Sequence, residues 1–374
     1  MLRDWKDVKR VVKIIVSGGG TGGHIYPALT LINSIKAKRP DTEFLYVGTE
    51  KGLEADIVPK AGINFTALNL EGGLERHFTL ENISRAANAI WSIKTAADIV
   101  KSFKPNVVVG TGGYVCGPIL LAASLMKVPT LIQEQNAVAG VTNKILSKFV
   151  DKIAVGTQDA LKNFPANKTT YTGNPIRAEV LAAKKEDGLR EFNFTADKPI
   201  VLISGGSRGA RSINDAMIDV LKVAAQKNTA QFLHVTGKGE FDSVTKKLAD
   251  VDAPNIRIVP YLYNMPRAMA MADLAIFRAG ATGLAELTAR GVPAILIPYP
   301  YAAENHQEFN ARALVDAGAA RMILNKDLNA ELLQKNLDEL LFSPQTLKQM
   351  AKASLSLGKP NAADEIADMI LNLT

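Results

Sequence analysis

Ile14-Ile15-Val16-Ser17 runs directly into Gly18-Gly19-Gly20-Thr21-Gly22-Gly23-His24, so a strand-like apolar segment ends in a glycine-rich loop. The arrangement recurs where Ile200-Val201-Leu202-Ile203 is followed by Ser204-Gly205-Gly206-Ser207-Arg208-Gly209-Ala210. A helix-like segment follows each loop. Glycine lets backbone N–H groups approach an anion closely, and a helix N-terminus adds partial positive charge. The two stretches predict two similar domains, each holding an anionic group, with the loops facing a shared crevice.

Short, continuous apolar runs are typical of strands buried on both faces of a parallel sheet. We expect strands at 12–16, 44–47, 107–109, 130–132 and 153–155, and again at 200–203, 231–235, 256–259, 274–277 and 294–297. Helical patterns lie between them at 25–38, 80–103 and 116–126, then at 209–226, 240–249, 282–290 and 307–317. This alternation predicts an α/β fold with two Rossmann-like, doubly wound parallel sheets.

The chain has 374 residues, which is long for one hydrophobic core and favours two domains. The break falls near Gly173-Asn174-Pro175-Ile176-Arg177, giving an N-terminal domain of 1–177 and a C-terminal domain of 178–358. A last helix, about 361–373, follows Gly358-Lys359-Pro360 and is expected to return to the first domain.

Composition narrows the class of protein. The single cysteine, Cys116, excludes a disulfide framework and a thiolate metal cluster. The charged N-terminus lacks a secretory signal and no apolar run is long enough to span a bilayer, so a cytosolic protein is expected. Residues 1–177 carry 22 Lys and Arg against 14 Asp and Glu, a net charge of +8, whereas 178–374 carry 22 against 23. The basic half favours an anionic partner, although the absence of a basic run interleaved with aromatics argues against nucleic acid.

Each glycine loop also fits another motif. Gly18–Gly23 matches the dinucleotide fingerprint, with Glu50 as a ribose ligand, but the spacing is loose for an NAD(P) enzyme. Gly205–Gly209 matches the nucleophile elbow of α/β-hydrolases around Ser207, with His234 or His306 as the base. That reading leaves the first domain unexplained.

Other polar residues gather where predicted strands end. They are Gly110-Thr111-Gly112-Gly113-Tyr114, Gln133-Glu134-Gln135-Asn136, and Arg278 to Gly283 with Glu286. Convergence on one sheet edge favours a ligand crevice. Asp250-Val251-Asp252 is the one acidic pair that resembles a metal clamp, but it follows a lysine-containing helical stretch, so we predict a solvated turn and no metal site.

Seven segments taken together carry a family resemblance: GGGTGGH (18–24), GTGGY (110–114), EQN (134–136), GNPIR (173–177), GGSRGA (205–210), ATGLAE (281–286) and ENHQ (304–307). In this order the chain resembles glycosyltransferase family 28, in particular the peptidoglycan enzymes that attach N-acetylglucosamine to lipid-linked N-acetylmuramoyl-pentapeptide. The likeness runs from about residue 12 to the C-terminus. It implies the GT-B fold, with the acceptor on the first domain and UDP-sugar on the second.

The resemblance assigns roles to individual residues. On the donor side it implies that Glu286 binds the UDP ribose, Gly206 and Ser207 the diphosphate, Leu262 the uracil, and Ala281, Thr282, Gly283, Leu284 and Ala285 the diphosphate and sugar. It further implies that Asn136 and Gln307 bind sugar hydroxyls and that Arg177 faces the donor. Thr21, Gly22 and Gly23 would line the acceptor side, and Tyr114 is a further substrate-binding residue. No cofactor is implied.

The implied reaction is an inverting transfer from UDP-N-acetylglucosamine to the acceptor's 4-hydroxyl. It needs a base near that hydroxyl and stabilisation of the departing diphosphate. His24 is the preferred base and Glu134 its competitor, while a purely structural role for His24 as a helix-start residue stays open. A rival within the same fold is another UDP-sugar enzyme, either a glycolipid glycosyltransferase or a UDP-N-acetylglucosamine epimerase.

A lipid acceptor implies a protein held peripherally on the cytoplasmic face of the membrane. Leu80, Ile83, Ala87, Ile90 and Trp91 share a helical stripe, with Arg76, Arg85, Lys94 and Lys101 around it. This stripe either packs on the sheet or dips into an anionic bilayer surface.

Overall fold

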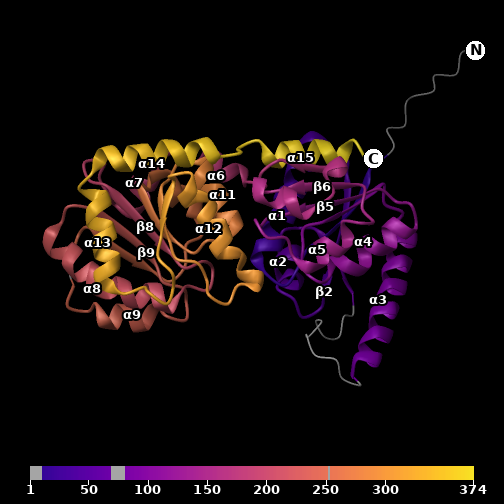
Figure 1. Ribbon diagram of the computed structural model, residues 1–374, viewed down its shortest axis with the longest axis horizontal. Helices are drawn as coiled ribbons and strands as arrows, with labels where there is room; N and C mark the ends of the chain where they lie inside the picture. The colour runs from indigo at the N-terminus through magenta and orange to yellow at the C-terminus, as the bar shows by residue number, and fades with distance from the viewer. Residues whose placement is uncertain (1–10, 69–80, 252) are drawn as a thin grey trace, which may run out of the picture. The chain divides into compact units, whose positions relative to one another are not determined.

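The computed structural model describes residues 11–68, 81–251 and 253–374, without the side chains of 81–90. The chain forms two compact units, each built on its own sheet (Figure 1). The first unit contains the chain up to Gln135, then Ala139–Pro175 and Asn361–Thr374. The second contains Asn136–Val138 and Ile176–Pro360.

The described part of the first unit has a seven-stranded parallel sheet in the order β3-β2-β1-β4-β5-β6-β7. Its strands are β1 (Lys13–Ser17), β2 (Glu43–Thr49), β3 (Asn64–Leu68), β4 (Val107–Gly110), β5 (Thr130–Glu134), β6 (Lys152–Val155) and β7 (Thr169–Tyr171). Its helices are α1 (Gly22–Lys38), α2 (Glu54–Lys60), α3 (Glu81–Phe103), α4 (Cys116–Leu125), α5 (Val141–Leu146) and α15 (Ala362–Leu371), with short 3₁₀ turns at Gln158–Asn163 and Ala166–Lys168.

Both faces of this sheet are buried because alternate residues along each strand point to opposite sides. Ile14 and Val16 of β1 pack with α1 and α15, whereas Ile15 packs on the other side with α3 and α4. Covered faces on both sides explain why these strands read as continuous apolar runs in the sequence.

The second unit repeats this plan with a six-stranded parallel sheet in the order β10-β9-β8-β11-β12-β13. Its strands are β8 (Ile200–Ser204), β9 (Gln231–Val235), β10 (Ile256–Val259), β11 (Leu274–Phe277), β12 (Ala294–Leu296) and β13 (Ala320–Met322). Its helices are α6 (Ala178–Ala182), α7 (Lys185–Phe192), α8 (Arg211–Lys227), α9 (Phe241–Lys247), α10 (Met265–Met271), α11 (Ala281–Ala289), α12 (His306–Asp316), α13 (Ala330–Leu341) and α14 (Pro344–Leu357), with a 3₁₀ turn at Ala303–Asn305.

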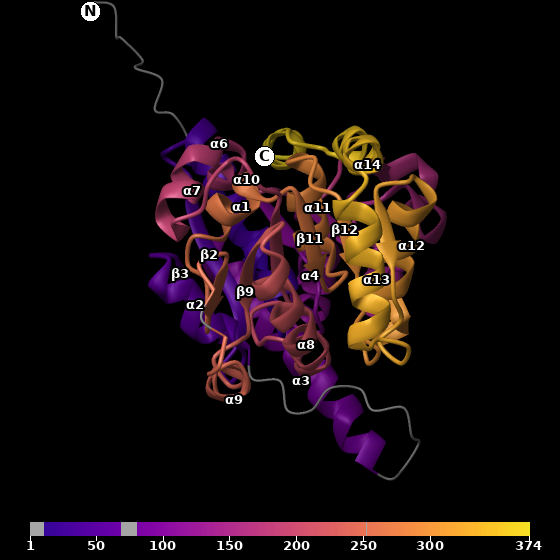
Figure 2. The same cartoon turned by 90° about the vertical axis from the view of Figure 1, so that its left-hand side faces the viewer.

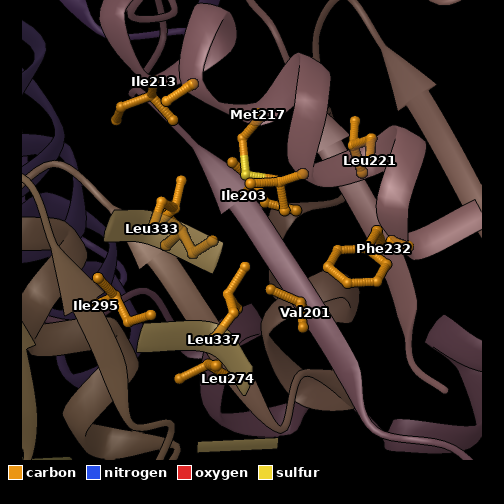
Figure 3. Packing of buried hydrophobic residues seen from close by; sticks show 14 of the residues in the cluster. Val201, Ile203, Ile213, Met217, Leu221, Phe232, Leu274, Ile295, Leu333 and Leu337 are labelled. Atoms are coloured by element: carbon orange, nitrogen blue, oxygen red, sulfur yellow. The ribbon is translucent and has the colours of Figure 1, made fainter. Parts of the chain in front are cut away.

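Helices α8 and α13 lie side by side on one face of the second sheet (Figures 1 and 2). Figure 3 shows how the core forms there: Met217 from α8 and Leu337 from α13 converge on Val201 and Ile203 of β8. Ile200 and Leu202 of the same strand point to the other face, toward a second cluster under α7, α10 and α11. The sheet is therefore held from both sides.

The ten predicted strands are all present, and the predicted α/β class with two parallel sheets is confirmed. The prediction missed β3, β7 and β13, which are edge strands of the two sheets. Their sequences, NFTAL, TTY and ARM, are short and mostly half-exposed, so they lack the apolar run by which the inner strands were recognised.

The chain's last helix, α15, belongs to the first unit and packs against α1. Ile366 and Ile370 are fully buried in the core beneath α1. At the helix surface Ser34 donates a hydrogen bond to Asp364 at 2.6 Å, and Lys38 pairs with Asp368 at 2.7 Å. The C-terminal residues thus complete the core of a unit that begins at the other end of the chain.

We expect Leu337→Ala to lower the free energy of unfolding of the second unit by about 2–5 kcal/mol, because it leaves a cavity between α13 and the sheet. Leu355→Ala is the matched control: Leu355 is 58% exposed, and we expect a change within about 0.5 kcal/mol. Urea unfolding followed by circular dichroism measures both. Equal effects of the two substitutions would contradict this account of the core.

Candidate functional site

Both glycine loops lie where the strand order of their sheet reverses. In the first unit the reversal falls between β1 and β4, and in the second between β8 and β11. At such a point the crossover helices turn to opposite faces, so the carboxyl edge of the sheet stays open for a ligand. The loop after each first strand is thereby placed next to the loop after its fourth.

The loop of the first unit is fastened by hydrogen bonds from several strands. The Tyr46 hydroxyl donates to the Gly18 carbonyl at 2.6 Å, and the Gly19 N–H donates to the Gly112 carbonyl at 3.2 Å. Cys116 lies below, where burial raises the pKa of its thiol to about 11, with Sγ within 3.1 Å of the Ser17 carbonyl. These contacts tie the loop and the end of β1 to β2, to the segment after β4 and to α4.

His24 is held in a defined orientation at the end of this loop. Its Nδ1 lies 2.9 Å from the carbonyl oxygen of Gly19. A carbonyl only accepts hydrogen bonds, so Nδ1 carries the proton and Nε2 of the neutral ring has a free lone pair. Gly112 has φ of +109°, and a Cβ there would lie 3.0 Å from Nε2. The glycine keeps this side of the imidazole open.

Glu134, the competing base, is only 2% exposed. Its carboxylate accepts hydrogen bonds from the Gly140 N–H at 3.1 Å and from the Asn143 side chain at 2.8 Å. It thus satisfies the start of α5, which has no other side-chain cap. Both hydrogen bonds go to Oε2 of Glu134, so this oxygen supports the start of α5. A role of Glu134 as the base stays a prediction.

Three buried carboxamides form the support behind these residues. Gln133 donates to Asn174 at 3.0 Å, Asn174 donates to the Gln135 carbonyl at 3.0 Å, and Gln135 donates to the Thr111 carbonyl at 2.6 Å. These three carboxamides therefore support the loop that carries Gly112, through the bond to the Thr111 carbonyl.

The remaining predicted acceptor residues surround the start of α1. Thr21 has extended backbone angles and is the N-cap of the helix, followed by Gly22 and Gly23. The first N–H groups of a helix have no partner within it, so those of Gly22 and Gly23 are available to an anion. Tyr114 is 46% exposed in the neighbouring loop after β4.

Two helix N-termini meet the carboxyl edge in the second unit. Helix α8 follows the loop of Gly206 and Ser207, and α11 follows Gly280 in the loop after the adjacent strand β11. Neither has a side-chain cap, so both leave N–H groups of their first turns for a ligand. The first turn of α11 contains Ala281, Thr282 and Gly283, and the Thr282 hydroxyl is buried without a partner. This arrangement suits a diphosphate.

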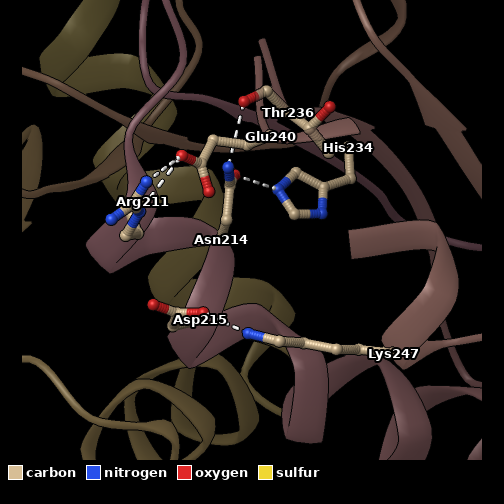
Figure 4. Close-up of polar contacts among 7 residues, drawn as sticks. All are labelled: Arg211, Asn214, Asp215, His234, Thr236, Glu240 and Lys247. Carbon is tan, nitrogen blue, oxygen red and sulfur yellow. Dashed lines mark hydrogen bonds and ion pairs between the residues drawn. The ribbon is translucent and has the colours of Figure 1, made fainter. Parts of the chain in front are cut away.

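A buried polar pair holds the α8 loop in place (Figure 4). Asn214 donates to the Thr236 carbonyl at 3.0 Å, and the same carbonyl lies 2.0 Å from where a Cβ on Gly209 would be. His234 Nε2 lies 3.0 Å from the Asn214 side-chain oxygen, so Nε2 is the protonated nitrogen. Its Nδ1 has no partner, and burial lowers the pKa of His234 to about 4. The pair was missed because neither residue belongs to a glycine motif.

Arg177 and Glu286 form a two-pronged ion pair at 2.7 and 3.0 Å. Glu286 is 4% exposed on α11, in the turn that follows the free N–H groups. The residue predicted to bind ribose therefore has a guanidinium on its carboxylate in this structure. A ribose would have to share this carboxylate with Arg177 or displace it.

The other predicted donor residues lie on loops and helices of the second unit. Asn136 accepts a hydrogen bond from Asn310 at 3.2 Å, and Asn310 also accepts from the Ala137 N–H at 2.9 Å. Gln307 accepts from the Tyr299 N–H at 2.9 Å. Leu262 follows β10 and packs partly on the core, while Leu284 and Ala285 continue α11. Asn310 was not predicted, because it lies in none of the sequence motifs.

The geometry does not support the hydrolase alternative or a metal site. His234 is bonded to Asn214 and His306 contacts the Ala303 carbonyl, so neither is seen to activate the exposed Ser207. Among the described residues there is no group of three or more His, Cys, Asp or Glu side chains that could hold a metal ion. Asp252 lies outside the described residues.

Two Rossmann-type units with anion-binding helix starts define the GT-B class of glycosyltransferases. Residues 14–155 match the glycosyltransferase family 28 N-terminal domain and residues 200–366 match its C-terminal domain. The chain belongs to glycosyltransferase family 28.

Similar proteins support the same family assignment. The chain is 47% identical to the Bacillus cytotoxicus UDP-N-acetylglucosamine--N-acetylmuramyl-(pentapeptide) pyrophosphoryl-undecaprenol N-acetylglucosamine transferase, over 97% of this chain and 99% of the relative. The Acetivibrio thermocellus enzyme of the same name is 44% identical, with 97% and 98% covered. A crystal structure of Acinetobacter baumannii MurG superposes with a TM-score of 0.79 at 29% identity, covering 96% and 99%. The predicted family and GT-B fold are confirmed.

The depressed pKa of His234 predicts acid sensitivity. The unfolded chain binds a proton near pH 6.5 but the native state only near pH 4, so stability falls as the pH drops through that window. We expect this histidine to account for a loss of about 2 kcal/mol between pH 7 and pH 5. Urea unfolding at both pH values, read on the transition that Leu337→Ala shifts, measures it. Between pH 7 and pH 5, the His234→Gln variant should lose about 2 kcal/mol less stability than the unaltered protein. An equal loss in both proteins would show that His234 is not the residue responsible.

Proposed function

We propose that this protein transfers N-acetylglucosamine from UDP-N-acetylglucosamine to the 4-hydroxyl of undecaprenyl-diphospho-N-acetylmuramoyl-pentapeptide, the lipid-linked precursor of peptidoglycan. Support comes from family membership and from relatives of that activity that match over almost the whole chain. The single observation that carries the mechanism is His24, whose protonated Nδ1 is engaged and whose Nε2 is the basic nitrogen.

On the donor side, the start of α8 and the start of α11 would hold the diphosphate of UDP with Ser207 and backbone N–H groups. Glu286 would accept hydrogen bonds from the ribose hydroxyls, which requires it to loosen its pair with Arg177. A freed guanidinium is then available to the donor phosphates. Leu262 would contact the uracil by its backbone, and Asn136 and Gln307 the sugar.

On the acceptor side, Thr21, Gly22, Gly23 and Tyr114 would bind the lipid-linked substrate. The acceptor's 4-oxygen attacks the anomeric carbon as its proton passes to Nε2 of His24. The bond between that carbon and the β-phosphate oxygen breaks, and its electron pair leaves with UDP. Positive helix ends at α8 and α11 stabilise the charge that develops there. Because the 4-oxygen attacks from the side opposite the departing UDP, the configuration at the anomeric carbon is inverted.

We expect His24→Ala to lower kcat by about 10²- to 10⁴-fold, because the proton acceptor is lost. Glu134→Gln should change kcat less than tenfold, because this carboxylate caps α5. Transfer of label from UDP-N-acetylglucosamine to the lipid acceptor measures both. If no label reaches the lipid in the unaltered protein, the proposed function is wrong, and conversion of the donor without acceptor would indicate an epimerase.

The membrane contact is a finer proposal. No helix among the described residues is long and apolar enough to cross a bilayer. Of the predicted stripe, only the side chain of Trp91 is described and it is 66% exposed; Leu80, Ile83, Ala87 and Ile90 lie outside the described side chains, as do Arg76 and Arg85. That stripe stays a prediction.

A second apolar surface, which we name the α4–α5 patch, supports membrane binding. It consists of Leu125, Met126, Val141, Ile145 and Phe149, which are between 40% and 67% exposed. Val141 and Ile145 lie one turn apart on α5, and a 2.8 Å hydrogen bond from Ser124 to the Phe149 carbonyl joins the end of α4 to this surface. Lys127, Lys144 and Lys148 lie in the same segments. An apolar surface among lysines suits an anionic leaflet.

We expect the double substitution Leu125→Glu/Ile145→Glu to weaken binding to vesicles containing anionic phospholipid by at least about tenfold, because two inserted side chains are replaced by charges. Sedimentation with vesicles measures it. Leu355→Glu, an equally exposed position in the second unit, should bind as the unaltered protein does. Equal binding by both variants would exclude the α4–α5 patch as the contact.

A further inference from the structure

The peptide group between Gly19 and Gly20 is hydrogen-bonded at both of its ends. Its carbonyl oxygen lies 2.9 Å from Nδ1 of His24, and its N–H donates to Oε2 of Glu54 at 3.1 Å. One peptide thus connects a carboxylate to the imidazole. The N–H of Gly20 is consumed by this contact and is not available to a phosphate, although it belongs to the glycine loop.

Glu54 is a buried carboxylate with three neutral donors around it. It is fully buried at the start of α2, and its other oxygen accepts from the N–H of Thr49 at 3.0 Å and from the Thr49 hydroxyl at 2.7 Å. Burial alone would raise the pKa of this carboxyl, but the bonds from Thr49 and Gly20 outweigh it and lower the pKa. Glu54 therefore carries its negative charge at neutral pH.

Three nearby glycines of the same chain leave space for this carboxylate. A Cβ on Gly19 would lie 2.5 Å from Oε1 of Glu54, and one on Gly52 would lie 2.2 Å from the same atom. A Cβ on Gly48 would lie 2.5 Å from Cγ. Side chains at these positions would displace the carboxylate. Part of the glycine content of this region therefore makes room for Glu54.

We propose that Glu54 is a positioning residue for His24 and acts through the Gly19–Gly20 peptide. The carboxylate polarises the peptide through its N–H, which makes the Gly19 carbonyl a stronger acceptor for the proton on Nδ1. The neutral ring is thereby kept in the form with the proton on Nδ1 and the lone pair on Nε2. This inference rests on the proposed function, in which Nε2 is the base.

This set of groups, Glu54, the Gly19–Gly20 peptide and His24, which we call the relay, is also consistent with the proposed proton transfer. When the acceptor's hydroxyl gives its proton to Nε2, the ring becomes a cation with both nitrogens protonated, while Nδ1 keeps its bond to the Gly19 carbonyl. The negative charge of Glu54 at the far end of the peptide stabilises this cation. At metal sites, a carboxylate bonded to a ligating histidine orients the ring by the same principle, and its loss typically costs 10- to 100-fold in affinity or activity.

Glu54→Gln tests the relay, with Tyr46→Phe as the matched control. Tyr46→Phe removes one buried hydrogen bond to the same loop, at the Gly18 carbonyl, but leaves the Gly19–Gly20 peptide untouched. We expect Glu54→Gln to lower kcat by 10- to 100-fold with KM for UDP-N-acetylglucosamine within about twofold, whereas Tyr46→Phe stays within about threefold in both. Equal losses in the two variants would mean that Glu54 only stiffens the loop.

The second readout is the position of the proton on His24, obtained from ¹⁵N chemical shifts of histidine-labelled protein and assigned with His24→Gln. We expect the Nδ1–H form in the unaltered protein and in Tyr46→Phe, and a larger share of the Nε2–H form in Glu54→Gln. If Glu54→Gln does not fold, Glu54→Asp, which keeps the charge but is one methylene shorter, replaces it. An Nε2–H form in the unaltered protein overturns the relay, whereas full activity of His24→Ala overturns the proposed base.

Discussion

The reversal of strand order within each sheet is the constraint on which the rest of the molecule depends. Between β1 and β4, and again between β8 and β11, the connecting helices turn to opposite faces and leave the carboxyl edge uncovered. Helix α1 begins at the carboxyl edge of the first sheet, and α8 and α11 begin at that of the second, so each edge receives unpaired N–H groups. The glycine loops, His24 and Glu286 are positioned by this framework.

The two glycine loops have similar sequences but opposite electrostatic support. Behind the loop of the first unit lies Glu54, a buried anion, and the loop presents a histidine that becomes a cation when it accepts a proton. Behind the loop of the second unit lie Asn214 and a neutral His234. A buried negative charge there would repel the diphosphate of a nucleotide sugar. The charge of the supporting residue thus fits the task that we propose for each loop.

The sequence predicted the inner strands and the ligand edge, since both leave local patterns: continuous apolar runs and glycines between a strand and a helix. Edge strands such as β13 escaped because they are short and have few consecutive apolar residues, whereas β10, also an edge strand, is mostly apolar and was predicted. The supporting residues escaped for another reason. Glu54, Asn214 and Asn310 act on chain segments 22 to 173 residues away, and nothing in their own surroundings marks them. The bonds that Gly140 and Asn143 donate to Glu134 were likewise not predictable, because no local pattern marks them.

Helix α15 has a consequence for biosynthesis. Ile366 and Ile370 fill the core under α1, so the first unit uses both the opening and the closing residues of the chain. Ile176–Pro360 of the second unit leave the ribosome before α15 does, because α15 follows them in the sequence. The first unit therefore begins to be synthesised first but completes its core later, and its apolar surface under α1 stays uncovered until α15 has been made.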